Sequence, residues 1–163
     1  MRRERGALRV WAILLVLLAA GTAWSEEGGA LPRSLRGHLR GEQFVAVSGV
    51  AALPSDVRDG LQVLWHSPKF ELAEPGAEFQ VTDVIVKPNL PIRRLILAGC
   101  STDHCIIYYE HGGIAHTHAV VLFQTKGAVR FEWGGAAPRD LGDLAQVQAA
   151  VLSGTVRGGT TYW

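Results

Sequence analysis

The sequence lacks the short motifs by which many enzymes are recognised. It has no glycine-rich phosphate-binding loop, no Gly-x-Ser-x-Gly nucleophile elbow and no His-Glu-x-x-His metal motif. It also has no internal repeat and no heptad series, and its one long apolar run extends from Val10 to Ala20. That run is shorter than the roughly 20 residues that a membrane-spanning helix needs. We therefore predict that the chain is not an enzyme, with no catalytic residue and no cofactor.

The first 25 residues are typical of a secretory signal peptide. A basic segment precedes the apolar run, and the small-x-small site Ala23-Trp24-Ser25 follows it. We expect cleavage after Ser25, which would leave an exported chain that begins at Glu26. The predicted location is therefore the periplasm or the exterior of the cell.

Positive charge is scarce once the signal peptide is set aside. Of the 16 basic and 15 acidic residues, the first 25 positions hold four arginines and one glutamate. The remainder has 12 basic and 14 acidic residues, a net charge near −2. A protein that binds nucleic acid or a membrane surface needs a basic field. We therefore expect neither of these partners, and no membrane span in the exported chain.

Cysteine is scarce too, because Cys100 and Cys105 are the only two in the chain. In an exported protein two cysteines most simply form one disulfide, since the compartments outside the cytoplasm are oxidising. A single Cys-x4-Cys segment lacks the second cysteine pair that a structural zinc site requires. We predict a small disulfide-closed ring that holds the shape of the local loop.

Hydrophobic patterning predicts a single α+β domain over residues 42–163, preceded by a flexible lead-in at residues 26–41. Two amphipathic stretches, 54–65 and 140–154, predict two short helices. Runs rich in β-forming residues predict an antiparallel meander sheet of about five or six strands. These runs are 42–49, 76–86, 92–99, 105–111, 114–123 and 127–133, and the tail at 155–163 would add an edge strand.

Four of the six histidines lie between Gly99 and His118. A turn centred on Gly112-Gly113 would align three of them on one face of a hairpin, namely His111, His116 and His118. Three imidazoles could hold zinc with water in the fourth position, which is the arrangement of a metal-dependent hydrolase. Glu110 would point to the opposite face. A solvated or hydrogen-bonded histidine face and a partner-contact surface are the alternatives.

The ring Cys100-Ser101-Thr102-Asp103-His104-Cys105 lies between two predicted strands and is followed by a hairpin, a tryptophan and a helix. This arrangement resembles the Ivy-type periplasmic lysozyme inhibitors, whose loop reads Cys-Lys-Pro-His-Asp-Cys, with His and Asp in the opposite order. The resemblance implies an exported α+β protein with an antiparallel sheet. It also implies that the disulfide-closed loop enters the lysozyme cleft and engages the catalytic carboxylates.

Together these observations predict an inhibitor-type binding protein that presents its disulfide-closed loop to a protein partner. The partner-binding residues would be Asp103 and His104 at the tip of the loop, flanked by Tyr109 and His111. The resemblance makes a lysozyme the candidate partner. An envelope accessory protein is one alternative, and a zinc hydrolase that uses the histidine face of the hairpin is another.

Overall fold

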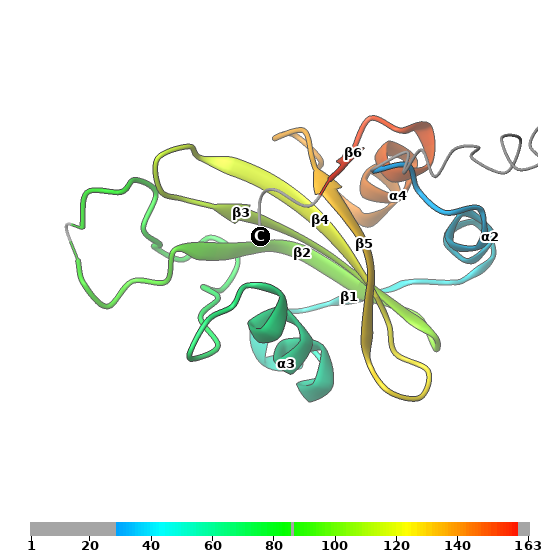
Figure 1. The fold of residues 1–163 in the computed structure, drawn as a ribbon, viewed down its shortest axis with the longest axis horizontal. Coiled ribbons are helices and arrows are strands. Elements are labelled where there is room, and N and C mark those ends of the chain that lie inside the picture. Colours follow the sequence, from blue (N-terminus) through cyan, green and yellow to red (C-terminus); the bar gives the residue numbers. More distant parts are fainter. Residues whose placement is uncertain (1–28, 86, 160–163) are drawn as a thin grey trace, which may run out of the picture.

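The computed structural model describes residues 29–85 and 87–159 (Figure 1). The predicted signal peptide and Trp163 lie outside the described residues. Within them the chain forms a six-stranded antiparallel sheet in which each strand lies beside its neighbours in sequence, with three α-helices and one 3₁₀-helix. The predicted α+β fold with an antiparallel meander is therefore confirmed.

The sheet consists of β1 (Val45–Val47), β2 (Arg93–Cys100), β3 (His104–His111), β4 (Thr117–Gln124), β5 (Arg130–Ala136) and β6 (Arg157–Gly158). The helices are α2 (Arg33–Gly41), α3 (Ser55–Leu64) and α4 (Leu144–Ser153), and η1 (Val50–Ala52) is the 3₁₀-helix. Both predicted helices are thus confirmed, and the edge strand predicted at 155–163 is present over Arg157–Gly158, while residues 160–163 lie outside the described part of the chain. At the start of α4 the Asp143 carboxylate accepts a hydrogen bond from the backbone N–H of Gln146, and Gly154 ends the helix in the left-handed conformation.

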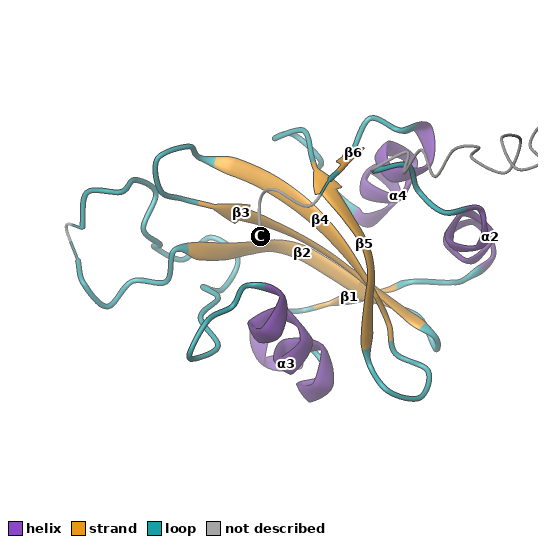
Figure 2. Ribbon diagram, viewed as in Figure 1, coloured by secondary structure: helices purple, strands orange, loops and turns teal. Residues whose placement is uncertain are grey.

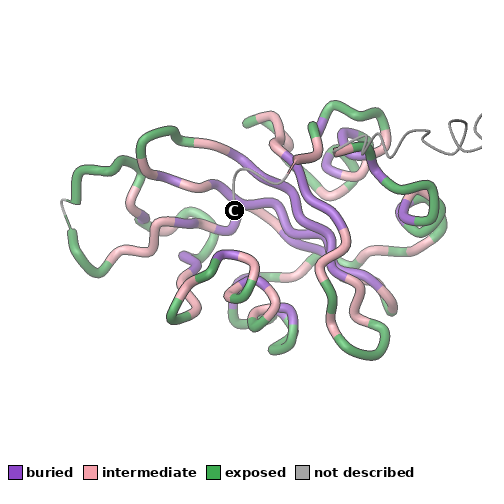
Figure 3. The backbone as a smooth tube through the Cα atoms, viewed as in Figure 1, coloured by how far each residue is buried: buried purple, intermediate pink, exposed green. Residues whose placement is uncertain are grey.

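Helices cover both faces of the sheet (Figure 2). Ile107 and Tyr109 of β3 pack in a core with α3, whereas Ile106 and Tyr108 pack in a second core with α2 and α4. Because side chains alternate along a strand, a central strand covered on both faces needs apolar residues at consecutive positions. This explains the unbroken burial of β3 and the interior of β4 (Figure 3).

The prediction of a flexible lead-in is wrong over residues 33–41, which form α2. Leu31, Leu35 and Leu39 recur at every fourth position and are all buried against the second core. The Arg36 guanidinium donates a hydrogen bond to the backbone oxygen of Leu152 in α4 (3.0 Å). Burial of this leucine stripe outweighs the low helix propensity of glycine, about 1 kcal/mol per residue.

The strand predicted at 76–86 is absent from the described residues. This part of the chain belongs instead to a long loop, defined here as residues 74–85 and 87–92, at one end of the sheet (Figure 1). Ala73, just before the loop, exchanges backbone hydrogen bonds with Arg93 and Leu95 (2.9 and 3.0 Å). That portion of the β2 edge is therefore already occupied, and β1 pairs farther along the same edge.

The predicted register of the β3–β4 hairpin is also wrong. The connection spans residues 112–116, Glu110 pairs with His118, and His111 pairs with Thr117. The two glycines that were expected to close the turn bind the long loop instead: Gly112 N–H donates to the oxygen of Ile92 and Gly113 N–H to that of Val81 (2.9 and 3.1 Å). As a result Glu110 and His118 share one face, and His111 lies on the other.

Candidate functional site

The predicted disulfide between Cys100 and Cys105 is present, and it joins two residues that pair across β2 and β3. Cys105 is fully buried in the core beneath α3. The Ser101 N–H donates to the oxygen of His104 (2.7 Å), which closes the turn inside the ring. The disulfide thus fixes the ends of two neighbouring strands, and Thr102 is the exposed residue of the turn.

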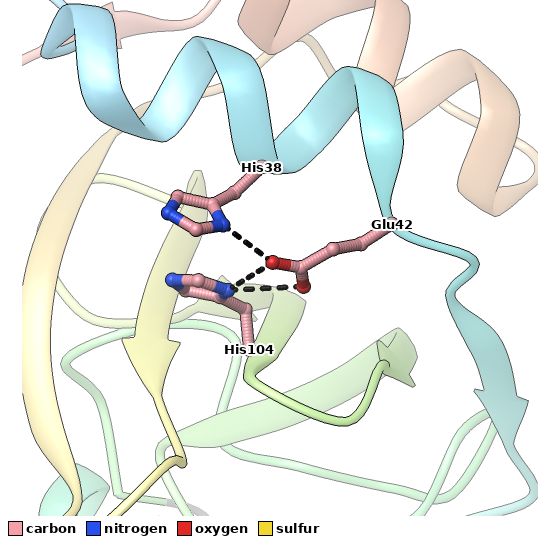
Figure 4. Close-up of side chains that lie close together, drawn as sticks. All are labelled: His38, Glu42 and His104. Carbon is pink, nitrogen blue, oxygen red and sulfur yellow. Dashed lines mark hydrogen bonds and ion pairs between the residues drawn. The ribbon is translucent and has the colours of Figure 1, made fainter.

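His104, predicted as a contact residue at the tip of the loop, is instead buried with 5 % of its surface exposed. Its Nδ1 lies 2.8 and 3.0 Å from the two carboxylate oxygens of Glu42 (Figure 4). His38 Nδ1 lies 2.6 Å from Oε1 of the same carboxylate. We call His38, Glu42 and His104 the disulfide-end cluster. The burial of His104 contradicts its predicted role as an exposed contact.

Two further polar groups support this cluster. The Ser101 hydroxyl donates a hydrogen bond to Oε2 of Glu42, and Nε2 of His104 lies 3.6 Å from Oε2 of Glu132. Burial raises the pKa of Glu42, but hydrogen bonds from Ser101, His104 and His38 outweigh it, so the pKa lies below its ordinary value. The Glu42 carboxylate is therefore ionised at neutral pH.

A second cluster occupies the hairpin, and we call Glu110, His116 and His118 the hairpin cluster. His116 Nε2 lies 2.6 Å and His118 Nε2 lies 4.0 Å from Oε2 of Glu110. The Arg94 guanidinium binds the other oxygen, Oε1, through Nε at 2.6 Å and Nη2 at 2.5 Å. The predicted zinc triad is therefore wrong in one member, because Glu110 takes the place that His111 was expected to fill.

Tyr109, the third predicted contact residue, is fully buried. Its hydroxyl oxygen accepts a hydrogen bond from the indole N–H of Trp65 (3.1 Å), and the Arg93 guanidinium stacks on the same indole at 4.6 Å. Burial raises the pKa of the Tyr109 hydroxyl. Tyr109 is a core residue in this structure, and its predicted contact role is wrong.

An open groove of about 610 Å³ lies between the long loop and the β3–β4 connection. Its apolar lining comes from Ile85, Pro88, Leu90, Ile92, Ile114 and Ala115. His111 also lines the groove; burial, together with the charge of Arg93, lowers its pKa to about 4. The imidazole is therefore neutral at pH 7. Among the predicted contact residues, His111 is the one that the structure places in this groove.

Sequence reasoning missed the long loop as part of a site because its apolar residues were assigned to a strand. The available signal was Asp83, a residue type depleted in strands, which lies in the middle of the predicted strand. Asp103, the remaining predicted contact residue, is half-buried beside the exposed Thr102, and Lys126 binds its carboxylate (3.2 Å).

No protein-family model, curated protein or solved structure matches this chain. None of the helices formed by the described residues has the length and apolar character required to cross a bilayer.

Proposed function

We propose that this chain is a non-enzymatic binding protein whose groove receives apolar side chains of a partner polypeptide. The observation that carries the proposal is the exposure of large apolar side chains on the two loops that form the groove. Ile114 is 95 % exposed and Ile85 is 72 % exposed. Exposing apolar surface to water costs free energy. Large exposed apolar patches on folded proteins therefore commonly mark interaction sites.

The extent of the apolar surface favours a polypeptide over a small molecule. Val81 and Val84 are also exposed, and they line the opposite side of the long loop, outside the groove. The surface available to a partner therefore continues past the groove itself. Four of the six large apolar side chains that are exposed among the described residues lie in these two loops: Val81, Val84, Ile85 and Ile114.

The charge of the groove favours an apolar segment without acidic side chains. His111 is neutral at pH 7, and the Lys87 ammonium is bound by the carboxylate of Glu78 (2.5 Å). Two carboxylates, Glu71 and Asp83, also line the groove. An acidic side chain entering it would therefore lose hydration and meet like charge, whereas a basic side chain could pair with Asp83.

The loops that form the groove are held by backbone contacts, which lowers the entropy that binding must remove. Gln80 N–H donates to the oxygen of Pro91 (2.8 Å), and Gly113 N–H donates to the oxygen of Val81. A Cβ atom added at Gly112 would lie 1.8 Å from the backbone oxygen of Gln80, so the close approach of the two loops requires glycine at this position.

The test is a selection of random peptides on the immobilised protein, followed by titration of each selected peptide measured by fluorescence anisotropy. We expect peptides with an apolar centre that bind the wild type and lose at least tenfold in affinity against Ile114→Asp. Val63→Asp is the matched control, since Val63 is 73 % exposed on α3, away from the groove. Peptides that bind both variants equally well would contradict the proposal.

We also propose that the protein is exported to the periplasm or the cell exterior. The Cys100–Cys105 disulfide supports this, because such bonds persist in oxidising compartments. The pattern of residues 1–25 supports it as well. Expression of the full chain in a bacterium, followed by mass measurement of the exported product, should give a chain that starts at Glu26. A product retained in the cytoplasm at full mass would contradict export.

A separate proposal, which uses the disulfide ring instead of the groove, follows from the resemblance to Ivy-type inhibitors: the partner is a lysozyme. The closed ring and the exposed Thr102 at its turn support it, although His104 is engaged by Glu42. The contact would then involve Ser101, Thr102 and Asp103. In a cell-wall lysis assay with lysozymes of several classes, we expect inhibition that Thr102→Arg removes. Folded protein that inhibits none of these lysozymes would contradict the lysozyme proposal and leave the groove proposal unaffected.

A further inference from the structure

The disulfide-end cluster has the donor set of a metal site. Its ligand atoms, two imidazole nitrogens and a carboxylate oxygen, all lie within 4.8 Å of one another. The two histidine rings are 4.4 Å apart at their centroids, and both direct Nδ1 toward the Glu42 carboxylate (Figure 4). The donors are brought together by the last turn of α2, the residue that follows it and the first residue of β3.

We propose that His38, Glu42 and His104 bind one divalent transition-metal ion. Two histidines and one glutamate are a known zinc ligand set, and three protein ligands leave a fourth position for water or another ligand. Imidazole also suits copper and nickel, so geometry and availability would select among these ions. Zn²⁺ is the ion that this donor set matches best.

The groups around the cluster are those that orient metal ligands. Nε2 of His104 faces the carboxylate of Glu132, which leaves Nδ1 directed at Glu42. The Ser101 hydroxyl holds Oε2 of Glu42. Hydrogen bonds to the far side of ligating histidines and carboxylates fix their orientation in metal sites. The Ser101 hydroxyl makes such a hydrogen bond to Glu42, and the Glu132 carboxylate lies at ion-pair distance from the far nitrogen of His104.

Access also fits a metal site. The His104 side chain is almost fully buried, the Glu42 side chain is mostly buried, and the His38 side chain is 48 % exposed. An ion could therefore approach from the His38 side. A groove of about 830 Å³ borders Glu42 and the turn of the disulfide ring, which gives solvent a route to this end of the sheet.

The hairpin cluster has the same residue types but carries a different charge. Arg94 already binds Glu110 through two nitrogen atoms, so the carboxylate is neutralised. An incoming cation would have to displace or tolerate this guanidinium. Among the interactions of the described residues, no arginine or lysine binds Glu42. The disulfide-end cluster is therefore the stronger candidate of the two.

The test is a calorimetric titration of ZnCl₂ into the full chain. The protein carries no polyhistidine tag and has been treated with a chelator to remove bound metal. We expect one equivalent of Zn²⁺ per chain. His38→Ala and Glu42→Gln should each weaken binding at least tenfold. His116→Ala, in the hairpin cluster, should leave binding unchanged. Circular dichroism of each variant establishes folding, and His38 is exposed enough that its removal should preserve the fold.

A second readout separates a metal site from histidines that only hydrogen-bond to Glu42. Co²⁺ bound by these ligands should give d–d absorption bands that disappear in His38→Ala, and affinity should fall at acid pH because protons compete for the imidazoles. The absence of stoichiometric Zn²⁺ binding in folded protein would overturn the proposal. Binding that survives His38→Ala but is lost in His116→Ala would also overturn it and assign the ion to the hairpin cluster.

Discussion

The two ends of the sheet use similar residues for different purposes. Each end holds one glutamate between two histidines, at Glu42 near the disulfide and at Glu110 beside the long loop. At the loop end Arg94 neutralises the carboxylate, whereas at the disulfide end the carboxylate faces imidazoles and a hydroxyl. The comparison teaches that the residue set alone does not define a metal site, because the nearest cation decides what the carboxylate can bind.

The largest expected effect is at the loop end. Glu110→Gln leaves the Arg94 guanidinium without its counter-ion in a mostly buried position, and it should destabilise the fold by about 2 to 3 kcal/mol. Glu42→Gln should cost only about 1 kcal/mol, because the ring N–H groups and the Ser101 hydroxyl can still donate to the amide oxygen. Urea unfolding of both variants measures the difference. Equal losses of unfolding free energy in the two variants would show that the two carboxylates lie in similar electrostatic environments.

Removal of the disulfide should have the next largest effect on stability, and local changes should be confined to the disulfide end of the sheet. The double variant Cys100→Ala/Cys105→Ala should lower the free energy of unfolding by about 2 kcal/mol, since the closed loop is short. Hydrogen exchange should rise at the turn near Thr102 and stay unchanged at the groove near Gly112. Exchange that rises equally at both ends would show that they are coupled.

His111 should make the loop end sensitive to acid. Burial and the charge of Arg93 lower its pKa to about 4 in the fold, so protonation favours the unfolded chain. The contribution of neutral His111 to the free energy of unfolding is fully present above pH 6.5. We expect the free energy of unfolding to fall by about 1 to 2 kcal/mol as the pH drops from 6.5 to 4, a figure reduced because solvent reaches part of the ring. His111→Gln should remove this part of the pH dependence in urea titrations. An unchanged dependence would contradict the assignment to His111.

The smallest effect on stability should come from the exposed apolar residues of the groove. Ile114→Ser should change the free energy of unfolding by less than about 0.5 kcal/mol, because the side chain has little burial to lose. Phe79→Ala is the contrast, since Phe79 is buried at the same end and Arg94 stacks on its ring at 4.4 Å. A large loss for Ile114→Ser would mean that this residue supports the fold rather than a binding surface.

Most of the elements could be predicted from periodicity, because the apolar spacing of residues 54–65 and 140–154 fits one helical face and the strands are rich in β-branched residues. The register of the hairpin could not, because Gly112 and Gly113 bind the long loop, a contact that no local pattern encodes. His118 pairs with Glu110 rather than with Ile107, a shift of three residues, and a shift by an odd number of residues reverses the faces of all side chains. The predicted histidine face therefore failed although its strands were correct.

The disulfide-end cluster was beyond sequence reasoning for a different reason. His38 and Glu42 are four residues apart, a spacing visible in the sequence, but they lie in a stretch predicted to be flexible. His104 is 62 positions from Glu42 and meets it only because α2 packs beside the start of β3. The disulfide, in contrast, needed no tertiary information, since the chain has two cysteines and they are five positions apart.

The order of the strands has a consequence for how the chain folds. β2, β3, β4 and β5 are joined by short connections and each pairs with the next, so these four central strands can form as consecutive hairpins with little loop closure. Among the described elements α2 and β1 come first, yet their partners, α4 and β2, lie far along the sequence. We therefore expect the four-stranded centre to form early and the amino-terminal segment to dock last, which makes the disulfide-end cluster a product of the final folding step.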